Sequence, residues 1–420
     1  MNKIEFHNAS SGSLERCQIS DKNDLELVID LGHQPLCDSL LNEEQLKLPE
    51  KTFPLRLYRS KSLGHGQLDY VVPGDEVYFP EYPYRPGITK EVVEHHKGRS
   101  DEAIKKYGIS TGSFVVDIGS NDGTLLSAYK ERGMKVLGVE PTNTSQIANE
   151  KGIETIQEFF TESTGENIVT NYGKAKLVTS TNVFAHMATL GEVILGIKKL
   201  LADDGLFILE NHYIVDILKN YQFDTIYHEH IRSYSLTSLV YLFRLYNMKV
   251  IDAEIVERYG GTLRATVSKD EKSKVSNSVD NLLSYEKSFG LFENHVWDNF
   301  RSMAHKVKND FLRVALSAAE NGERFVGKSC PGRCSTLLNF FGIGKDLMPY
   351  IAEQPTSFKK GLYLPGRHIP IVDDEVLFKE QPDYVVILAW HYWKSIVPDL
   401  KKRGLRSKFV IPLPTVKIID

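Results

Sequence analysis

One glycine-containing segment holds the residue types from which a nucleotide site is built. An apolar run, Phe114–Ile118, is typical of a buried strand and leads directly into a glycine turn and a helical pattern. The polar and glycine residues of this segment are Asp117, Gly119, Asn121, Asp122 and Gly123. Glycines let a ligand approach the backbone, and a helix N-terminus presents N–H groups without helical partners. The spacing G-x-x-x-G differs from the G-x-G-x-x-G pattern of standard NAD sites, so we expect a different nucleoside ligand.

An acidic residue at the next strand end supports this interpretation. Glu140 follows the run Lys135–Val139, which has the composition of a second strand. A carboxylate in this place suits the two hydroxyls of a ribose. The simpler alternative is a tight turn with a surface glutamate. The glycine turn, Glu140 and the alternation of strands and helices around them together favour a bound nucleoside.

The central part of the chain, residues 89–270, alternates predicted strands and helices. The clearest helices are Lys90–Tyr107 and Leu190–Leu201, and further strands are expected at 177–182 and 206–210. Such alternation predicts an α/β fold with a doubly wound, Rossmann-like sheet.

Two flanking parts complete the expected organisation. Residues 1–88 are rich in proline, glycine and aromatic residues and predict a small strand-rich module. Residues 271–420 begin with a long helical stretch, 271–322, that connects to a second α/β unit. The sequence therefore predicts three domains.

The bulk composition argues against several classes of function. Lys and Arg total 51 against 55 Asp and Glu, and the net charge of −4 favours neither nucleic acid nor an acidic membrane as partner. No apolar run approaches the ~20 residues of a membrane helix, and the N-terminus lacks the apolar core of a secretory signal. Four cysteines in 420 residues do not make a disulfide framework, so we expect a cytoplasmic protein.

With these features in place, the chain resembles the SAM-dependent C-methyltransferases of nucleotide-activated deoxysugar biosynthesis, which methylate carbon 3 of ketosugars. The resemblance covers nearly the whole chain, and its most specific segment is Tyr-His-Glu-His beside a methyltransferase turn. Besides the Asp117 turn, the segments that carry it are Asp30-Leu-Gly-His-Gln-Pro-Leu36, Phe53-Pro-Leu55, Gln67-Leu68, Tyr82-Pro-Tyr84, Asn182-Val-Phe-Ala-His186, Tyr227-His-Glu-His230, Gly260-Gly-Thr-Leu-Arg264, Leu364-Pro-Gly366 and Ile369-Pro-Ile371. The resemblance implies an N-terminal zinc module, a SAM-binding domain and a C-terminal α/β domain that helps hold a nucleotide-diphosphate 4-keto-6-deoxysugar.

The resemblance also gives the Tyr-His-Glu-His segment a role in catalysis. C-methylation beside a ketone needs a base for the α-proton and a group that stabilises the enolate oxygen. If residues 227–230 form a helical turn, Tyr227 and His230 share one face while His228 and Glu229 point elsewhere. The resemblance implies that His230 is the base, with the near-neutral pKa of a histidine, and that Tyr227 and Glu229 lie near the sugar. It adds His186 at the edge of the sheet.

The alternative is that these are polar-tipped packing residues. A metal site is less favoured, because His-Glu-His lacks the H-E-x-x-H spacing that puts two histidines on one helical face.

The resemblance completes the expected ligand contacts. Cofactor contacts are expected from the glycine turn, Glu140, Asn182 and Tyr84. Substrate contacts are expected from Tyr82, Arg264, Arg333, Asn339 and Arg367.

Two segments depart from the family pattern. The zinc module of the family uses two C-x-x-C pairs, but this chain has Cys17-Gln-Ile-Ser20 and Ser60-Lys-Ser-Leu63. Serine and leucine do not replace thiolates, and nothing in the sequence places His7 or His65 as substitutes, so we expect a metal-free module.

The second departure is the loop Gly327–Thr336. It resembles a degraded P-loop with Arg333 in the lysine position, which makes nucleotide hydrolysis a poor expectation but leaves a diphosphate contact open. Cys330 and Cys334 are expected to be buried thiols; a redox or metal role for the pair is a minority interpretation.

Two other functions stay open from the sequence. One is O- or N-methylation of a small molecule, which needs no α-proton to be lost. The other is a catalytically silent protein that binds a sugar nucleotide or a partner. The oligomeric state, monomer or dimer, also stays open.

Overall fold

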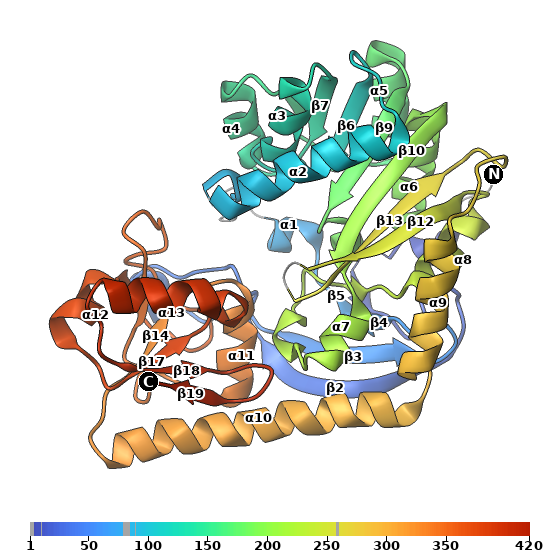
Figure 1. The fold of residues 1–420 in the computed structure, drawn as a ribbon. Helices are drawn as coiled ribbons and strands as arrows, with labels where there is room; N and C mark the ends of the chain where they lie inside the picture. Colours follow the sequence, from blue (N-terminus) through green and yellow to red (C-terminus); the bar gives the residue numbers. More distant parts are fainter. Residues whose placement is uncertain (1–3, 10, 79–84, 89, 258–259) are drawn as a thin grey trace.

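The computed structural model describes residues 4–9, 11–78, 85–88, 90–257 and 260–420. Figure 1 shows an upper α/β part, an N-terminal sheet below it and a second α/β part at the lower left, with one long helix running beneath. Among the described helices, none is long and apolar enough to cross a membrane.

The N-terminal module is a small antiparallel sheet to which a distant segment contributes an edge strand. The strand order is β11-β4-β3-β2. The strands are β2 (Leu25–Gln34), β3 (Phe53–Ser60), β4 (Gly66–Leu68) and β11 (Arg232–Ser233). A second pair joins β1 (Gly12–Ser13) to β5 (Tyr70–Val71), and the short helix α1 spans Gly74–Val77. Because β11 pairs with β4 directly after residues 227–230, the Tyr-His-Glu-His segment lies between two domains.

The central part is a seven-stranded sheet in the order β12-β13-β10-β9-β6-β7-β8. Its strands are β6 (Phe114–Ile118), β7 (Lys135–Val139), β8 (Thr155–Ile156), β9 (Ala175–Thr181), β10 (Leu201–His212), β12 (Lys249–Val256) and β13 (Thr262–Ser268). Its helices are α2 (Lys90–Tyr107), α3 (Thr124–Glu131), α4 (Thr144–Glu150), α5 (Glu162–Tyr172), α6 (Leu190–Leu200), α7 (Ile214–Lys219) and α8 (Leu236–Leu245). The five strands from β10 to β8 are parallel, and β12 and β13 are antiparallel. From β6 the chain continues to β7 on one side, whereas β9 pairs with β6 on the other side. The strand order therefore changes direction at β6, and ligands of open α/β sheets bind at such a switch point.

The C-terminal part is a second α/β layer structure. The sheet order is β16-β15-β14-β17-β18-β19, parallel except for β19. Its elements are β14 (Phe325–Lys328), α11 (Arg333–Phe341), β15 (Ile351–Glu353), β16 (Ile371–Asp373), α12 (Glu375–Glu380), β17 (Tyr384–Ile387), α13 (Trp393–Lys402), β18 (Lys408–Ile411) and β19 (Lys417–Ile419). The helices α9 (Asn277–Phe289) and α10 (Asn294–Glu320) connect it to the centre.

The expected fold class is confirmed, with differences at element ends. Helix α2 has the predicted bounds, and the apolar strands β6 and β9 are buried as their composition requires. The stretch 271–322 is two helices rather than one, because Gly290 ends α9 in a left-handed conformation with φ +81°.

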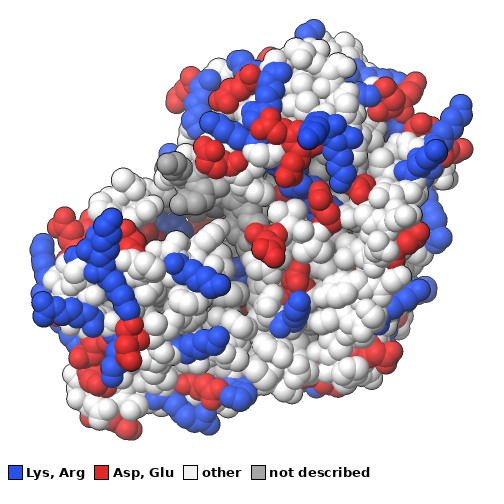
Figure 2. All heavy atoms as spheres, in the orientation of Figure 1, with Lys and Arg blue, Asp and Glu red and all other residues white. Residues whose placement is uncertain are grey.

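Charges of both signs are interspersed on the face shown in Figure 2, as the net charge of −4 suggests. This face is hollowed where the upper part meets the lower-left part.

Candidate active site

The glycine turn after β6 adopts the backbone conformation that its residues favour. Gly119 and Gly123 have φ angles of +72° and +74°, in the left-handed region. A Cβ atom on Gly119 would lie 2.5 Å from Cγ2 of Val183, so only glycine fits without a shift of that side chain. Asn121 also has a positive φ, of +49°. The turn brings bare backbone to the N-terminus of α3, as an approaching ligand requires.

Two carboxylates hold the turn in shape. Asp117 is buried and accepts a 2.6 Å hydrogen bond from Thr179 Oγ1. Burial raises the pKa of Asp117 to about 7, although the Thr179 bond opposes the shift. Asp122 Oδ2 accepts from the Gly87 backbone N–H at 3.1 Å and from Lys151 Nζ at 3.0 Å. Both side chains thus have a structural task beside the ligand contact predicted for them.

Glu140 and Asn182 lie at the carboxyl edge of the sheet beside this turn. Glu140 accepts hydrogen bonds from the backbone N–H groups of Asn121 at 3.0 Å and Thr142 at 2.9 Å. Asn182 follows β9 with φ +54°, and its backbone N–H donates to the Glu210 carbonyl at 2.8 Å. Its side-chain Oδ1 is buried and accepts no hydrogen bond from the described residues. Because an unpaired buried acceptor is costly, a donor-bearing ligand such as the adenosyl part of SAM fits this edge.

Three histidines gather where the central part meets the N-terminal module. His186 ends the 3-10 helix Phe184–His186, His212 ends β10, and His230 ends the turn 227–230. The His230 ring lies 4.9 Å from the His186 ring and 4.9 Å from the His212 ring, between centroids. His186 and His230 were predicted from the sequence, whereas His212 was missed. Its position at the carboxyl end of a sheet strand was the available signal.

Residues 227–230 form a single turn that is closed by a hydrogen bond between its first and fourth residues. The His230 backbone N–H donates to the Tyr227 carbonyl at 2.8 Å, and β11 begins at Arg232, which leaves no length for a helix. The two side chains nevertheless meet, with ring centroids 3.9 Å apart. Burial raises the pKa of Tyr227, so its hydroxyl keeps its proton and is a hydrogen-bond donor at neutral pH.

The orientation of the His230 ring is fixed by a backbone carbonyl. Nδ1 lies 2.7 Å from the Thr225 carbonyl oxygen, which only accepts, so Nδ1 carries the hydrogen and Nε2 of the neutral ring is a proton acceptor. Burial lowers the pKa of His230 to about 4; the Thr225 bond opposes this and the Arg333 charge adds to it. The near-neutral pKa expected from the sequence is therefore wrong, and the cause is desolvation.

Glu229 lies within the cluster rather than pointing away from it. Cys37 Sγ donates to Glu229 Oε1 at 3.7 Å, and His186 Nδ1 lies 3.9 Å from Oε2. The Tyr78 ring stacks 6.3 Å from that of His186. His228 turns away from the cluster and is buried against the N-terminal sheet, with Nε2 3.3 Å from the Phe53 carbonyl. Cys37 and Tyr78 were missed, because no local pattern distinguishes them in the N-terminal module.

Arg333 lies near the histidines, but its guanidinium is already paired with a carboxylate. Its Nε and Nη2 donate to the two carboxylate oxygens of Asp224 at 2.8 and 2.7 Å. Its guanidinium also lies 5.3 Å from the centroid of the Trp390 ring. The predicted contact of Arg333 with a diphosphate would have to compete with Asp224.

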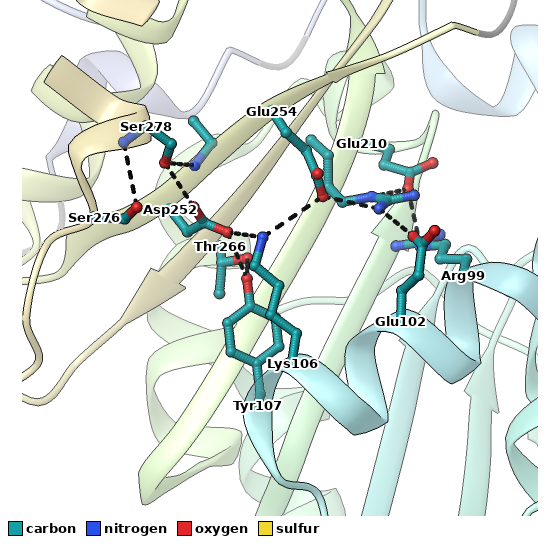
Figure 3. A network of polar contacts seen from close by, with 12 residues as sticks. Arg99, Glu102, Lys106, Tyr107, Glu210, Asp252, Glu254, Thr266, Ser276 and Ser278 are labelled. Atoms are coloured by element: carbon teal, nitrogen blue, oxygen red, sulfur yellow. Dashed lines mark hydrogen bonds and ion pairs between the residues drawn. The ribbon is translucent and has the colours of Figure 1, made fainter. Parts of the chain in front are cut away.

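Arg264 belongs to a partly buried ion-pair network on the α2 side of the sheet; Figure 3 labels its acidic partners Glu102, Glu210 and Glu254. Its Nε donates to Glu210 at 2.6 Å, and its Nη1 lies 3.0 Å from Glu102 and 2.9 Å from Glu254. Arg99 Nε lies 3.0 Å from the same Glu210 oxygen. Three carboxylates compensate the Arg264 charge, which argues against the substrate contact predicted for it; a sequence shows the cation but not its counter-ions.

The other predicted substrate residues lie apart. Arg367 Nη2 donates to the Asn339 carbonyl at 2.7 Å, and Asn339 Nδ2 donates to the Pro365 carbonyl at 3.0 Å. Both lie toward the C-terminal end of α11, whereas Arg333 begins that helix. Tyr82 and Tyr84 are outside the described residues.

The positions at which the family has zinc-binding cysteines make other contacts in this chain. Cys17 Sγ lies 3.9 Å from His65 Nε2, while Ser60 Oγ donates to Asp24 at 3.2 Å. Leu63 packs in the apolar core. His7 is engaged elsewhere, with Nδ1 2.6 Å from the Tyr246 hydroxyl and Nε2 2.9 Å from the Ile19 carbonyl. A metal-free module stays a prediction.

Cys330 and Cys334 are buried free thiols, as expected, with their sulfur atoms 3.7 Å apart.

Comparison with known proteins covers all three parts of the chain. Family models match a zinc binding domain at residues 17–78, a methyltransferase domain at 93–253 and a C-methyltransferase C-terminal domain at 257–414. The C-methyltransferase NovU of Streptomyces niveus is 32% identical over 413 residues, which is 97% of both chains.

Solved structures that are similar cover less than half of this chain. A methyltransferase in complex with the Haloferax volcanii Trm112 activator is 15% identical with a TM-score of 0.36, over 44% of this chain and 95% of that one. A Burkholderia thailandensis 1,6-didemethyltoxoflavin-N1-methyltransferase with bound S-adenosylhomocysteine is 17% identical with a TM-score of 0.33, over 44% and 81%.

The full-length match to NovU and the three domain matches agree with the resemblance read from the sequence. SAM is the cofactor of this enzyme, and the chain belongs to the family of SAM-dependent C-methyltransferases.

Proposed function

We propose that this enzyme methylates carbon 3 of a nucleotide-linked 4-keto-6-deoxysugar, as a step in the synthesis of a branched sugar. The observation that carries the proposal is the pair formed by Tyr227 and His230. A histidine whose acceptor nitrogen is fixed by the Thr225 carbonyl lies 3.9 Å, ring to ring, from a tyrosine that keeps its proton. These are the base and the donor that an enolate mechanism needs.

In this mechanism, His230 Nε2 accepts the proton on carbon 3, next to the ketone at carbon 4. The electron pair of the broken C–H bond moves into the enolate, and the Tyr227 hydroxyl donates a hydrogen bond to the enolate oxygen. When bound, SAM would supply an electrophilic methyl group: carbon 3 would form its bond to the methyl as the S–CH3 bond breaks, and S-adenosylhomocysteine would be the leaving group. Burial of the cluster excludes water and strengthens both polar interactions.

We infer that one reaction uses both the proposed cofactor edge and the histidine cluster. The support is Tyr78, whose ring stacks on His186 and whose pKa, raised mainly by burial, is raised further by the charges of Glu229 and Glu140. Glu229 is proposed to orient its neighbours or to bind a sugar hydroxyl.

The C-terminal part is proposed to hold the nucleotide. In its sheet the chain leaves β14 for β15 on one side while β17 lies on the other, a second switch point. The loops that follow these strands carry Arg333 and Trp390, on the side of Asp224. A cytoplasmic location and the oligomeric state, monomer or dimer, stay predictions.

The test is incubation of the full-length protein with SAM and a panel of dTDP-, GDP- and CDP-linked 4-keto-6-deoxysugars, read by mass spectrometry. The expected result is the gain of one methyl group by at least one of these sugars. Methylation of another small molecule at oxygen or nitrogen, with every 4-ketosugar refused, would favour the alternative enzyme.

A further inference from the structure

The 3-10 helix η5 (Phe223–Thr225) ends on the carbonyl that orients His230. It precedes the Tyr-His-Glu-His turn, so its position determines where the imidazole lies. Thr225 has one anchored neighbour on each side. Both anchors come from the C-terminal part of the chain, more than a hundred residues away in sequence.

The first anchor is a buried ion pair. Arg333, at the start of α11, donates two hydrogen bonds to Asp224, and the Trp390 indole Nε1–H donates a third at 2.8 Å. Asp224 is 1% exposed and Arg333 is 8% exposed, so water competes little for these bonds. A bidentate arginine fixes both the position and the plane of the carboxylate.

The second anchor is Thr336 on α11, whose Oγ1 donates to the Ile226 carbonyl at 3.2 Å. Asp224 and Ile226 flank Thr225, and both are bound by one helix. Movement of α11 would therefore move the Thr225 carbonyl and the imidazole with it.

We propose that Arg333 is a positioning residue for His230: through Asp224 it holds the turn whose carbonyl orients the base. The inference deepens the proposed function and rests on it for the kinetic consequence. It assigns the segment Gly327–Thr336, which runs from the end of β14 into α11, the task of positioning the base from the C-terminal part.

Two substitutions distinguish the effect of the position of the turn from the effect of the Arg333 charge on His230. Arg333→Gln and Asp224→Asn both break the ion pair and free the turn, so both should lower kcat by about 10- to 100-fold, as expected for misplacement of a catalytic group. KM for the sugar nucleotide should change by less than about threefold, because Arg333 is paired with Asp224 and this proposal leaves the nucleotide contact to other residues of the C-terminal part.

The pKa of His230 should move in opposite directions in these variants. Removal of the guanidinium raises it, because the Arg333 charge lowers it in the parent protein. Asp224→Asn leaves the Arg333 charge uncompensated and therefore lowers the pKa of His230 further. A general loss of structure would not produce this pattern.

The matched control is Arg403→Gln. Arg403 makes the same kind of bidentate pair, with Asp374 at 2.9 and 3.0 Å, and lies 4.3 Å from the Phe378 ring centroid in the same part of the chain. It should leave kcat and the His230 tautomer unchanged.

The measurements are steady-state kinetics and long-range 1H–15N spectra of histidine-labelled full-length protein, with the His230 signals assigned from His230→Asn. The parent should show His230 with hydrogen on Nδ1, and Arg333→Gln should show a mixture of tautomers. S-adenosylhomocysteine binding checks that each variant is folded. If Arg333→Gln does not fold, Trp390→Phe, which removes one donor and keeps a ring, should show a smaller change of the same kind.

An unchanged tautomer with unchanged kcat in Arg333→Gln would overturn the inference. So would a loss confined to KM, which would return Arg333 to the substrate. If the parent protein methylates no ketosugar, the proposed function fails, while the tautomer spectra still decide whether Arg333 positions His230.

Discussion

Acidification of the assay gives a quantitative prediction about the base. Only neutral His230 can accept a proton, so activity is lost as pH falls through its pKa. Burial lowers that pKa from 6.5 to about 4. At pH 5.5 a group with a pKa of about 4 is roughly 97% neutral, whereas an unperturbed histidine is about 9% neutral. The structure therefore predicts about tenfold more activity at pH 5.5 than an exposed histidine base would allow.

The assay is kcat/KM against pH from 4.5 to 8, because this ratio reports the ionisation of the free enzyme. Circular dichroism at each pH must show that the protein is still folded. An acidic limb well below pH 6 is the expected result. A limb centred near 6.5 would refute the reasoning, since it would mean that water reaches the imidazole or that another group is the base.

Three further predictions follow from the same contacts. Glu140→Ala should weaken S-adenosylhomocysteine binding in calorimetry by roughly tenfold or more, because charge-assisted bonds worth ~1–3 kcal/mol are lost; unchanged affinity would remove Glu140 from the site. The free energy of unfolding, from urea titrations, should fall between pH 7 and 5, because burial lowers the pKa of His7 and His228 to about 4 while the unfolded chain takes up protons below about 6.5; a stability that is flat over this range would contradict it. Elemental analysis should find no stoichiometric zinc, and a value near one zinc per chain would identify Cys17 and His65 as the first ligands to examine.

The cofactor half of the site could be predicted because its signals are local. Gly119, Gly123 and Glu140 follow apolar strands, and the carboxyl ends of parallel strands meet at one edge. His212 follows the same rule at the end of β10, so its omission was avoidable.

The other half depends on contacts between distant segments, which a sequence does not display. Cys37 meets Glu229 only because the N-terminal sheet takes β11 as its edge strand. Arg264 and Arg333 looked like free cations, but each is neutralised by carboxylates from other elements. Burial, the cause of the low pKa of His230, is likewise a property of the assembled chain.

The central claim is that His230 removes a proton from carbon 3 before the methyl group is added. Its most direct test uses a 4-ketosugar nucleotide with deuterium at carbon 3, with the parent protein and His230→Ala compared at equal cofactor saturation. The account predicts a methylated product that has lost the deuterium, and a loss of about 10² to 10⁴-fold in turnover for His230→Ala with S-adenosylhomocysteine binding intact. A product that keeps the deuterium, or near-normal turnover of His230→Ala, would contradict it, and His186 would become the next residue to test.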